Sequence, residues 1–260
     1  MKRILLAALA AVLMAASSDA QPKRPRHPMD RSAKGLGLTF GYTHSSYRTT
    51  DWATDEVVTS AGLDGFFAGI TKDLSIIPRK FYFQTGVDYI YQNDERNETV
   101  TVAGLDAGLR IVGDRTEHYM AVPLRLKYSV PLTDRIGLDI DAGPTLLLGL
   151  SSKMKYRTRF ADGVSTGVTY NIYKGEMDKA NMKVDRWDIA QWINGTGMLP
   201  EGRLRRGDIT MGASVGADFF NVMEVRMGYD WGLVNRYRKT VTEDLIMRRG
   251  QFTLSVGVRF

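Results

Sequence analysis

The sequence predicts an all-β protein, an eight-stranded antiparallel transmembrane β-barrel with long extracellular loops, and three observations predict it. Eight runs of alternating apolar and polar residues follow one another from residue 35 to the C-terminus, and such alternation is typical of strands with two different faces. Short and long connections alternate between the runs, as in barrels that have tight periplasmic turns and long outer loops. The last run, GQFTLSVGVRF, ends the chain on its apolar face at Phe260.

The first 20 residues have the features of a secretory signal peptide. MKR precedes the apolar run ILLAALAAVLMAA, and the small residues that follow predict cleavage near Ala20 and export to an outer membrane. Residues 21–34 carry three prolines and a cluster of bases, so we expect a flexible basic periplasmic tail. The barrel domain is expected to span residues 35–260. Because the chain has no cysteine, burial and hydrogen bonding alone must stabilise this exported fold.

Each alternating run is expected to form one strand. In chain order the runs are KGLGLTFGYTHSSY (34–47), LDGFFAGITK (63–72), FYFQTGVDYIYQ (81–92), YMAVPLRLKYSV (119–130), IGLDIDAGPTLLLGL (136–150), DITMGASVGADFF (208–220), VMEVRMGYDWGL (222–233) and GQFTLSVGVRF (250–260). The short connections are residues 73–80, 131–135 and 219–222, and the long ones are residues 48–60, 92–117, 150–207 and 235–247. A soluble β-sandwich also accommodates eight alternating strands, but it does not predict this rhythm.

The polar faces carry charges that can pair across hairpins. A hairpin centred near Thr133 would set Arg125 opposite Asp141 and Lys127 opposite Asp139, and opposite charges facing each other across a strand pair are favourable. Paired charges would plug an interior that is just wide enough for side chains. A proton or ion relay is the functional alternative. The expected lumen ion-pair residues are Arg125, Lys127, Asp139, Asp141, Asp218 and Arg226.

Aromatic residues on the apolar faces gather at the two ends of the expected strands. Two aromatic belts separated by aliphatic residues are typical of strands that cross two water–lipid interfaces. The belt beside the short turns and the C-terminus contains Phe81, Phe83, Tyr128, Phe219 and Phe260, and the belt toward the long connections contains Tyr42, Phe66, Tyr89, Tyr91, Tyr229 and Trp231. These belts favour lipid-facing apolar stripes over a soluble core.

Two stretches carry a family likeness. YMAVPLRLKYSV, followed by a short turn and by Ala-Gly-Pro at 142–144, resembles the PorT-like outer-membrane β-barrel family of Bacteroidetes. The resemblance implies an outer-membrane barrel, and the founding member of that family implies a role in protein secretion. The terminal strand that ends at Phe260 looks like the signal read by the barrel-assembly machinery, which it implies as a partner. The long connection at 150–207 departs from the family pattern.

A basic stripe is expected where the fifth strand leaves the membrane. If its alternation continues past Leu150, four cations share the inner face: Lys153, Lys155, Arg157 and Arg159. Such a stripe would form an anion-attracting vestibule or a contact surface for lipopolysaccharide phosphates. A solvated loop base is the alternative. We do not expect nucleic acid as a partner, despite a formal net charge of +6, because the chain is exported.

His44 and Ser46 lie two residues apart on the expected apolar face of the first strand. A histidine can activate a serine hydroxyl for acyl transfer, and this pair looks like the catalytic pair of lipid A deacylase barrels. The sequence shows no carboxylate at a position that would orient His44. Two polar residues at the wet end of a strand are therefore the simpler interpretation. The histidines do not have the spacing of metal ligands, and we expect neither a metal nor a cofactor.

The sequence therefore predicts a non-enzymatic barrel with a structural or interaction role. Its extracellular loops are expected to bind a surface or envelope protein partner, a glycan or lipopolysaccharide, and the barrel itself contacts outer-membrane lipid. Three alternatives stay open: an esterase that modifies lipid A through His44 and Ser46, a barrel associated with secretion, and a small pore.

Overall fold

The computed structural model describes residues 36–51, 53–54, 57–77, 80–100, 109–133, 135–159, 165–174, 176–178, 204–220, 222–237 and 245–260. The predicted signal peptide at 1–20 and the predicted periplasmic tail at 21–34 lie outside the described residues. No helix within the described ranges is long and apolar enough to cross a membrane.

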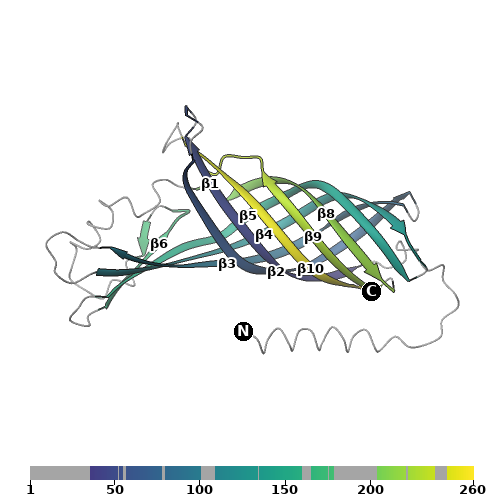
Figure 1. Ribbon diagram of the computed structural model, residues 1–260, viewed down its shortest axis with the longest axis horizontal. Coiled ribbons are helices and arrows are strands. Elements are labelled where there is room, and N and C mark those ends of the chain that lie inside the picture. The colour runs from purple at the N-terminus through teal and green to yellow at the C-terminus, as the bar shows by residue number, and fades with distance from the viewer. Residues whose placement is uncertain are drawn as a thin grey trace.

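Ten strands form one antiparallel sheet (Figure 1). Their bounds are β1 (Gly37–Asp51), β2 (Val57–Ile77), β3 (Phe81–Val100), β4 (Leu109–Pro131), β5 (Ile136–Arg159), β6 (Ser165–Asn171), β7 (Glu176–Asp178), β8 (Gly207–Phe219), β9 (Met223–Gly232) and β10 (Leu245–Arg259). Eight of them follow the order β4-β3-β2-β1-β10-β9-β8-β5, and β4 also pairs with β5, so the sheet closes on itself. The predicted eight-stranded antiparallel barrel is confirmed.

The register sets the tilt of the strands. Followed from Gly37 across the other seven barrel strands, the pairing returns to β1 at Tyr47, a stagger of ten residues. With a rise of about 3.3 Å per residue and strands about 4.8 Å apart, this stagger corresponds to a tilt of about 40°. A barrel of this size leaves an interior that side chains can fill.

The barrel is apolar outside and polar inside. On adjacent strands, Leu126 and Ile140 are 58% and 59% exposed, whereas Lys127 and Asp139 are fully buried. Large hydrophobic side chains lie exposed on all eight barrel strands. A water-soluble sandwich would bury these same stripes, so the apolar face is the face that lipid covers.

Aromatic side chains gather near both ends of the lipid-facing surface. Toward the short turns, the rings of Phe81 and Tyr128 pack with their centroids 4.8 Å apart. Toward the long connections, Tyr229 packs against Trp231 at 4.9 Å and Phe66 against Tyr91 at 5.2 Å. The amphipathic rings are thus placed where each interface of a bilayer is expected.

The strands continue well into the predicted long connections. β3 and β4 remain paired from Tyr89 and Met120 as far as Val100 and Leu109, and β5 continues to Arg159, where it pairs with β6. In Figure 1, β3, β4, β5 and β6 project beyond the barrel at the end opposite the C-terminus. The ladder hydrogen bonds of these hairpins do not depend on burial in the membrane, which is why hydropathy alternation misses their extent.

The C-terminal strand closes the barrel. β10 pairs with β1 from Gly37 and Arg259 to Asp51 and Leu245, and the Phe260 amide donates to the carbonyl of Leu36 at 3.0 Å. Closure leaves no exposed edge along these two strands. Recognition of Phe260 by the assembly machinery stays a prediction.

Candidate functional site

A cluster of buried charges fills the lumen near the short turns. Lys127 Nζ lies 3.4 Å from Asp73, 3.2 Å from Asp139 and 3.0 Å from Glu224. Arg259 also binds Asp73 at 2.8 Å and forms an ion pair with Glu224. Each cation thus contacts more than one carboxylate, as buried charges require.

A second group of ion pairs lies next to the first along the lumen. Arg125 binds Asp141 at 3.1 Å and Asp230 at 2.6 Å. Arg226 binds the same Asp141 at 2.7 Å and also pairs with Glu224. The two groups therefore form one continuous network across five strands, β2, β4, β5, β9 and β10.

The register behind these pairs differs from the predicted one by two residues. Thr133 Oγ1 accepts from the amides of Arg135 and Ile136 at 3.2 and 3.0 Å, so the turn takes up more of the connection than expected. Lys127 is consequently opposite Asp141, and Ser129 is opposite Asp139. The long side chains of Arg125 and Lys127 reach their predicted carboxylates diagonally.

Asp218 shares this end of the lumen with two other carboxylates. Oxygen atoms of Asp139, Asp218 and Glu224 lie within 4.8 Å of one another, close enough to hold a cation. The ammonium of Lys127 binds two of the three and supplies that positive charge. This arrangement accounts for the acidic cluster without a metal.

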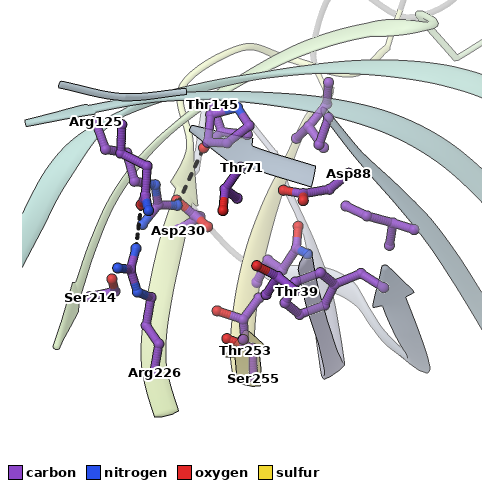
Figure 2. A pocket seen from close by; sticks show the side chains of 18 of the residues that line it. Thr39, Thr71, Asp88, Arg125, Thr145, Ser214, Arg226, Asp230, Thr253 and Ser255 are labelled. Carbon is purple, nitrogen blue, oxygen red and sulfur yellow. Dashed lines mark hydrogen bonds and ion pairs between the residues drawn. The ribbon is translucent and has the colours of Figure 1, made fainter. Parts of the chain in front are cut away.

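A cavity of about 90 Å³ lies next to this ion-pair network, on the side toward the long connections (Figure 2). Figure 2 shows Asp88 across the cavity from Arg125 and Asp230. Phe67 and Leu147 form part of its apolar wall. The space is enough for a few water molecules and far too small for an open aqueous channel.

Glu117 anchors the polar cluster at the outer mouth. This fully buried carboxylate accepts hydrogen bonds from Tyr47 at 2.7 Å, Arg115 at 2.7 Å, Ser152 at 2.9 Å and also from Tyr119. The rings of Tyr47 and Tyr119 also make cation–π contacts with the guanidinium groups of two further arginines. These stacked cations are Arg236, 4.8 Å above the Tyr47 ring, and Arg249, 4.5 Å above the Tyr119 ring.

The mouth cluster continues into residues beyond the strands. Burial alone would lower the pKa of Arg236, but Tyr119, Tyr47 and Glu117 hold that pKa well above its ordinary value. Burial raises the pKa of Tyr173, in the turn after β6, to about 12. Both side chains therefore keep their protons at physiological pH, and the mouth stays plugged by fixed charges and rings.

The predicted inner basic stripe is wrong in its facing. The β4–β5 register shifts between His118 and Tyr119, so that Leu150 is an extra residue in β5. Beyond this bulge Ser152 is fully buried and bonds to Glu117, whereas Lys153 is exposed. A β-bulge reverses the parity of every residue that follows it.

The basic stripe lies on the outer side of the projecting strands. Lys153 and Lys155 are exposed there, and Lys155 is directly opposite Asp114. The backbones of Arg157 and Arg159 belong to β5, but their side chains lie outside the described residues. Lys153 and Lys155 therefore do not line a vestibule inside the barrel.

The sequence analysis did not identify a pair of arginines on the β1–β10 strand pair. Arg48 on β1 and Arg248 on β10 are direct cross-strand partners, and both are exposed on the outer face. Within the described ranges neither forms an ion pair. The signal in the sequence was their shared outward parity, which becomes informative only once the β1–β10 register is known.

The structure supplies the carboxylate that the sequence did not reveal for His44. Asp64 on β2 is the direct cross-strand partner of His44, and its Oδ1 lies 2.7 Å from His44 Nδ1. Tyr42, two residues before His44 on the same face, donates a hydrogen bond to the same oxygen. The group lies on the outside of the barrel, with the His44 and Asp64 side chains 43% and 64% exposed.

Ser46 continues this outward row. Its two direct cross-strand partners are both glycines, Gly62 on β2 and Gly250 on β10. The Ser46 hydroxyl donates to the Gly250 carbonyl at 3.4 Å. Because neither glycine has a side chain, the His44 imidazole can lie over Gly62 and the Tyr229 phenol over Gly250.

Comparison with known proteins gives the family. A family model described as outer membrane protein beta-barrel domain matches residues 5–260. The chain belongs to this family. As a member of it, and with a closed barrel of eight antiparallel strands, the protein is an outer-membrane β-barrel protein. None of the curated proteins compared matches the chain.

Several solved structures are similar in fold to this outer-membrane barrel. Ail, the attachment invasion locus protein of Yersinia pestis, in complex with the heparin analogue sucrose octasulfate, is 12% identical with a TM-score of 0.36, over 87% of this chain and 99% of that chain. OprG from Pseudomonas aeruginosa is 8% identical with a TM-score of 0.39, over 88% and 97%. The Neisserial surface protein A is 10% identical with a TM-score of 0.34, over 86% and 97%.

Proposed function

We propose that the protein has a structural and interaction role, in which its outer rim binds phosphate groups of lipopolysaccharide. The observation that carries the proposal is the pair Arg48 and Arg248, which are exposed and directly opposite each other on the lipid-facing seam. They lie beyond the aromatic belt residue Tyr42, toward the outer ends of their strands.

Like charges directly opposite each other destabilise a strand pair. Lys155, by contrast, has a residue of opposite charge, Asp114, as its direct cross-strand partner on β4. A phosphate between Arg48 and Arg248 would turn the repulsion into two charge-assisted hydrogen bonds, since guanidinium groups match phosphate geometry. Phosphates of the outer leaflet are available at this level, just outside the hydrocarbon core.

Other roles receive less support. A small pore conflicts with a lumen filled by the Lys127 and Arg125 networks and by the Glu117 cluster. Binding of a glycan or surface protein by the projecting strands, where Lys153 and Lys155 are exposed, stays compatible with the proposal. A closer relation to the PorT-like branch, and a role in secretion, stay predictions.

Binding of purified barrel to lipid A in detergent tests the proposal. The double variant Arg48→Gln/Arg248→Gln should bind at least about tenfold more weakly, because two charge-assisted hydrogen bonds are lost. Lys155→Gln is the matched control and should bind like the wild type. Equal affinity of the wild type for lipid A and for its dephosphorylated form would contradict the proposal.

A further inference from the structure

The row of polar residues on the outer face of β1 lies beside the aromatic belt, where the acyl esters of outer-leaflet lipids are located. We propose that Ser46, His44 and Asp64 form an ester-hydrolysing site that acts on the ester-linked acyl chains of such lipids. Ser46 and His44 are the catalytic residues, and Asp64 is the positioning residue.

Asp64 fixes the orientation of the imidazole. With His44 Nδ1 bound to Asp64 Oδ1 at 2.7 Å, Nδ1 carries the proton and Nε2 is left as the free base. The second hydrogen bond, from Tyr42 to the same carboxylate oxygen, holds Asp64 in place. Carboxylate, imidazole and hydroxyl then have the order of roles that activates a serine.

The imidazole extends toward Ser46 along the outer surface. A methyl group on Gly62 would lie 3.1 Å from His44 Cε1 and 3.7 Å from His44 Nε2, and Gly62 is the cross-strand partner of Ser46. The Nε2 edge of the ring is therefore over the residue beside the serine. Rotation about the Ser46 Cα–Cβ bond brings its hydroxyl from the Gly250 carbonyl toward this edge.

The surroundings of Ser46 give room and a hydrogen-bond donor. Side chains on Gly62 or Gly250 would flank the hydroxyl on both sides; a methyl group on Gly250 would lie 2.9 Å from Ser46 Oγ and would collide with the Tyr229 hydroxyl. The phenol of Tyr229 thus lies over Gly250, next to the serine. It can donate to the oxyanion that develops on an attacked ester carbonyl.

The reaction balances with water as the only co-reactant. Ser46 Oγ attacks the ester carbonyl while His44 Nε2 takes its proton, and the tetrahedral intermediate expels the alcohol, which receives that proton. Water then attacks the acyl-serine with His44 again as the base, which releases the fatty acid and restores Ser46.

The substrate class follows from position. Arg48, two residues beyond Ser46 on the same face, would hold a lipid phosphate above the hydroxyl, so this part rests on the proposed function. Ester cleavage itself does not require the phosphate contact. A phosphate-free short-chain ester therefore separates the two proposals.

The test measures fatty acid release from lipid A and from diacyl phospholipid in mixed micelles, together with hydrolysis of p-nitrophenyl butyrate. We expect release by the wild type and a loss of at least about a hundredfold in Ser46→Ala and His44→Ala. Asp64→Asn should lower the rate and shift its pH profile, because the tautomer of His44 is no longer fixed. Thr50→Ala, on the same outward row, is the matched control and should retain full activity.

Fluorophosphonate labelling provides a readout that does not depend on choosing the substrate. The modified peptide should contain Ser46 in the wild type and be absent in Ser46→Ala, with both proteins shown to be folded by heat-modifiable electrophoretic migration. A folded wild type that neither hydrolyses any of the three esters nor reacts at Ser46 would overturn the inference. Hydrolysis of the butyrate ester unaffected by Arg48→Gln/Arg248→Gln would uphold it even if phosphate binding failed.

Discussion

At the scale of single residues, the core of this protein is ionic where a soluble protein's core is apolar. Lys127, fully buried, is within 3.4 Å of Asp73, Asp139 and Glu224. Removing one partner from such a group leaves charges buried without compensation, which costs far more than the group contributes over an apolar filling. The buried cations of the lumen should therefore tolerate substitution poorly.

Lys127→Met tests this at one position. The side chain keeps its volume but leaves three carboxylates without their shared cation, so we expect the free energy of unfolding to fall by about 3 kcal/mol. Urea titration of the barrel in lipid vesicles, followed by heat-modifiable migration, measures it. Lys153→Met, on an exposed outward lysine, should change stability by less than about 0.5 kcal/mol. Equal stability of both variants would show that Lys127 is not needed to compensate the carboxylates.

At the scale of elements, one bulge decides what the upper half of β5 does. The extra residue at Leu150 turns Ser152 into the lumen and Lys153 and Lys155 to the outside. Without it the lysines would crowd the mouth beside Arg115, Arg236 and Arg249. The bulge thus keeps further cations away from a mouth that already holds three arginines around the buried carboxylate of Glu117.

Cysteine scanning checks this facing directly, because the chain has no cysteine of its own. With a membrane-impermeant maleimide on intact cells, we expect Lys153→Cys and Lys155→Cys to react fully and Ser152→Cys to react at least about tenfold more slowly. Burial of the Ser152 side chain beside Glu117 is the physical reason. Rapid labelling at 152 with protection at 153 would restore the uninterrupted alternation.

At the scale of the whole molecule, closure and filling act together. Pairing of β10 with β1 removes the sheet edges, and the stagger of ten residues leaves a lumen that side chains occupy over most of its length. The cavity of about 90 Å³ beside Arg125 and Asp88 has room for a few water molecules. The two activities that we propose, phosphate binding and ester hydrolysis, are accordingly placed on the outer surface of the described residues, where Arg48, His44 and Ser46 lie.

Planar bilayer recording tests the filled lumen. The wild-type barrel should give no stepwise current in molar potassium chloride, since ions cannot pass two layers of buried ion pairs. A barrel whose lumen is known to be open, recorded in a bilayer of the same lipid composition, would serve as the positive control. Regular, voltage-independent current steps from the wild type would contradict the plug and revive the small pore.

Much of the fold could be predicted from the sequence because a strand in a membrane barrel has two chemically different faces. Alternation located all eight barrel strands, and the aromatic belts and paired lumen charges followed from the same parity. The upper parts of β3 and β4 escaped because polar residues occupy both parities there, as in NDERNET at 93–99, so alternation carries no signal. The facing of Lys153 escaped because a bulge in β5 has no mark in its sequence.

The sequence by itself determined the barrel, its lipid-facing stripes and six of the charged residues that face its lumen, since each depends only on the period of one strand. The tertiary structure decided what lies beside what. The two-residue shift at Lys127, the carboxylate of Asp64 beside His44 and the juxtaposition of Arg48 with Arg248 all depend on register between strands. Register between strands is set by turns and closure, and the residues it brings together in these three cases are 14 to 200 positions apart in the chain.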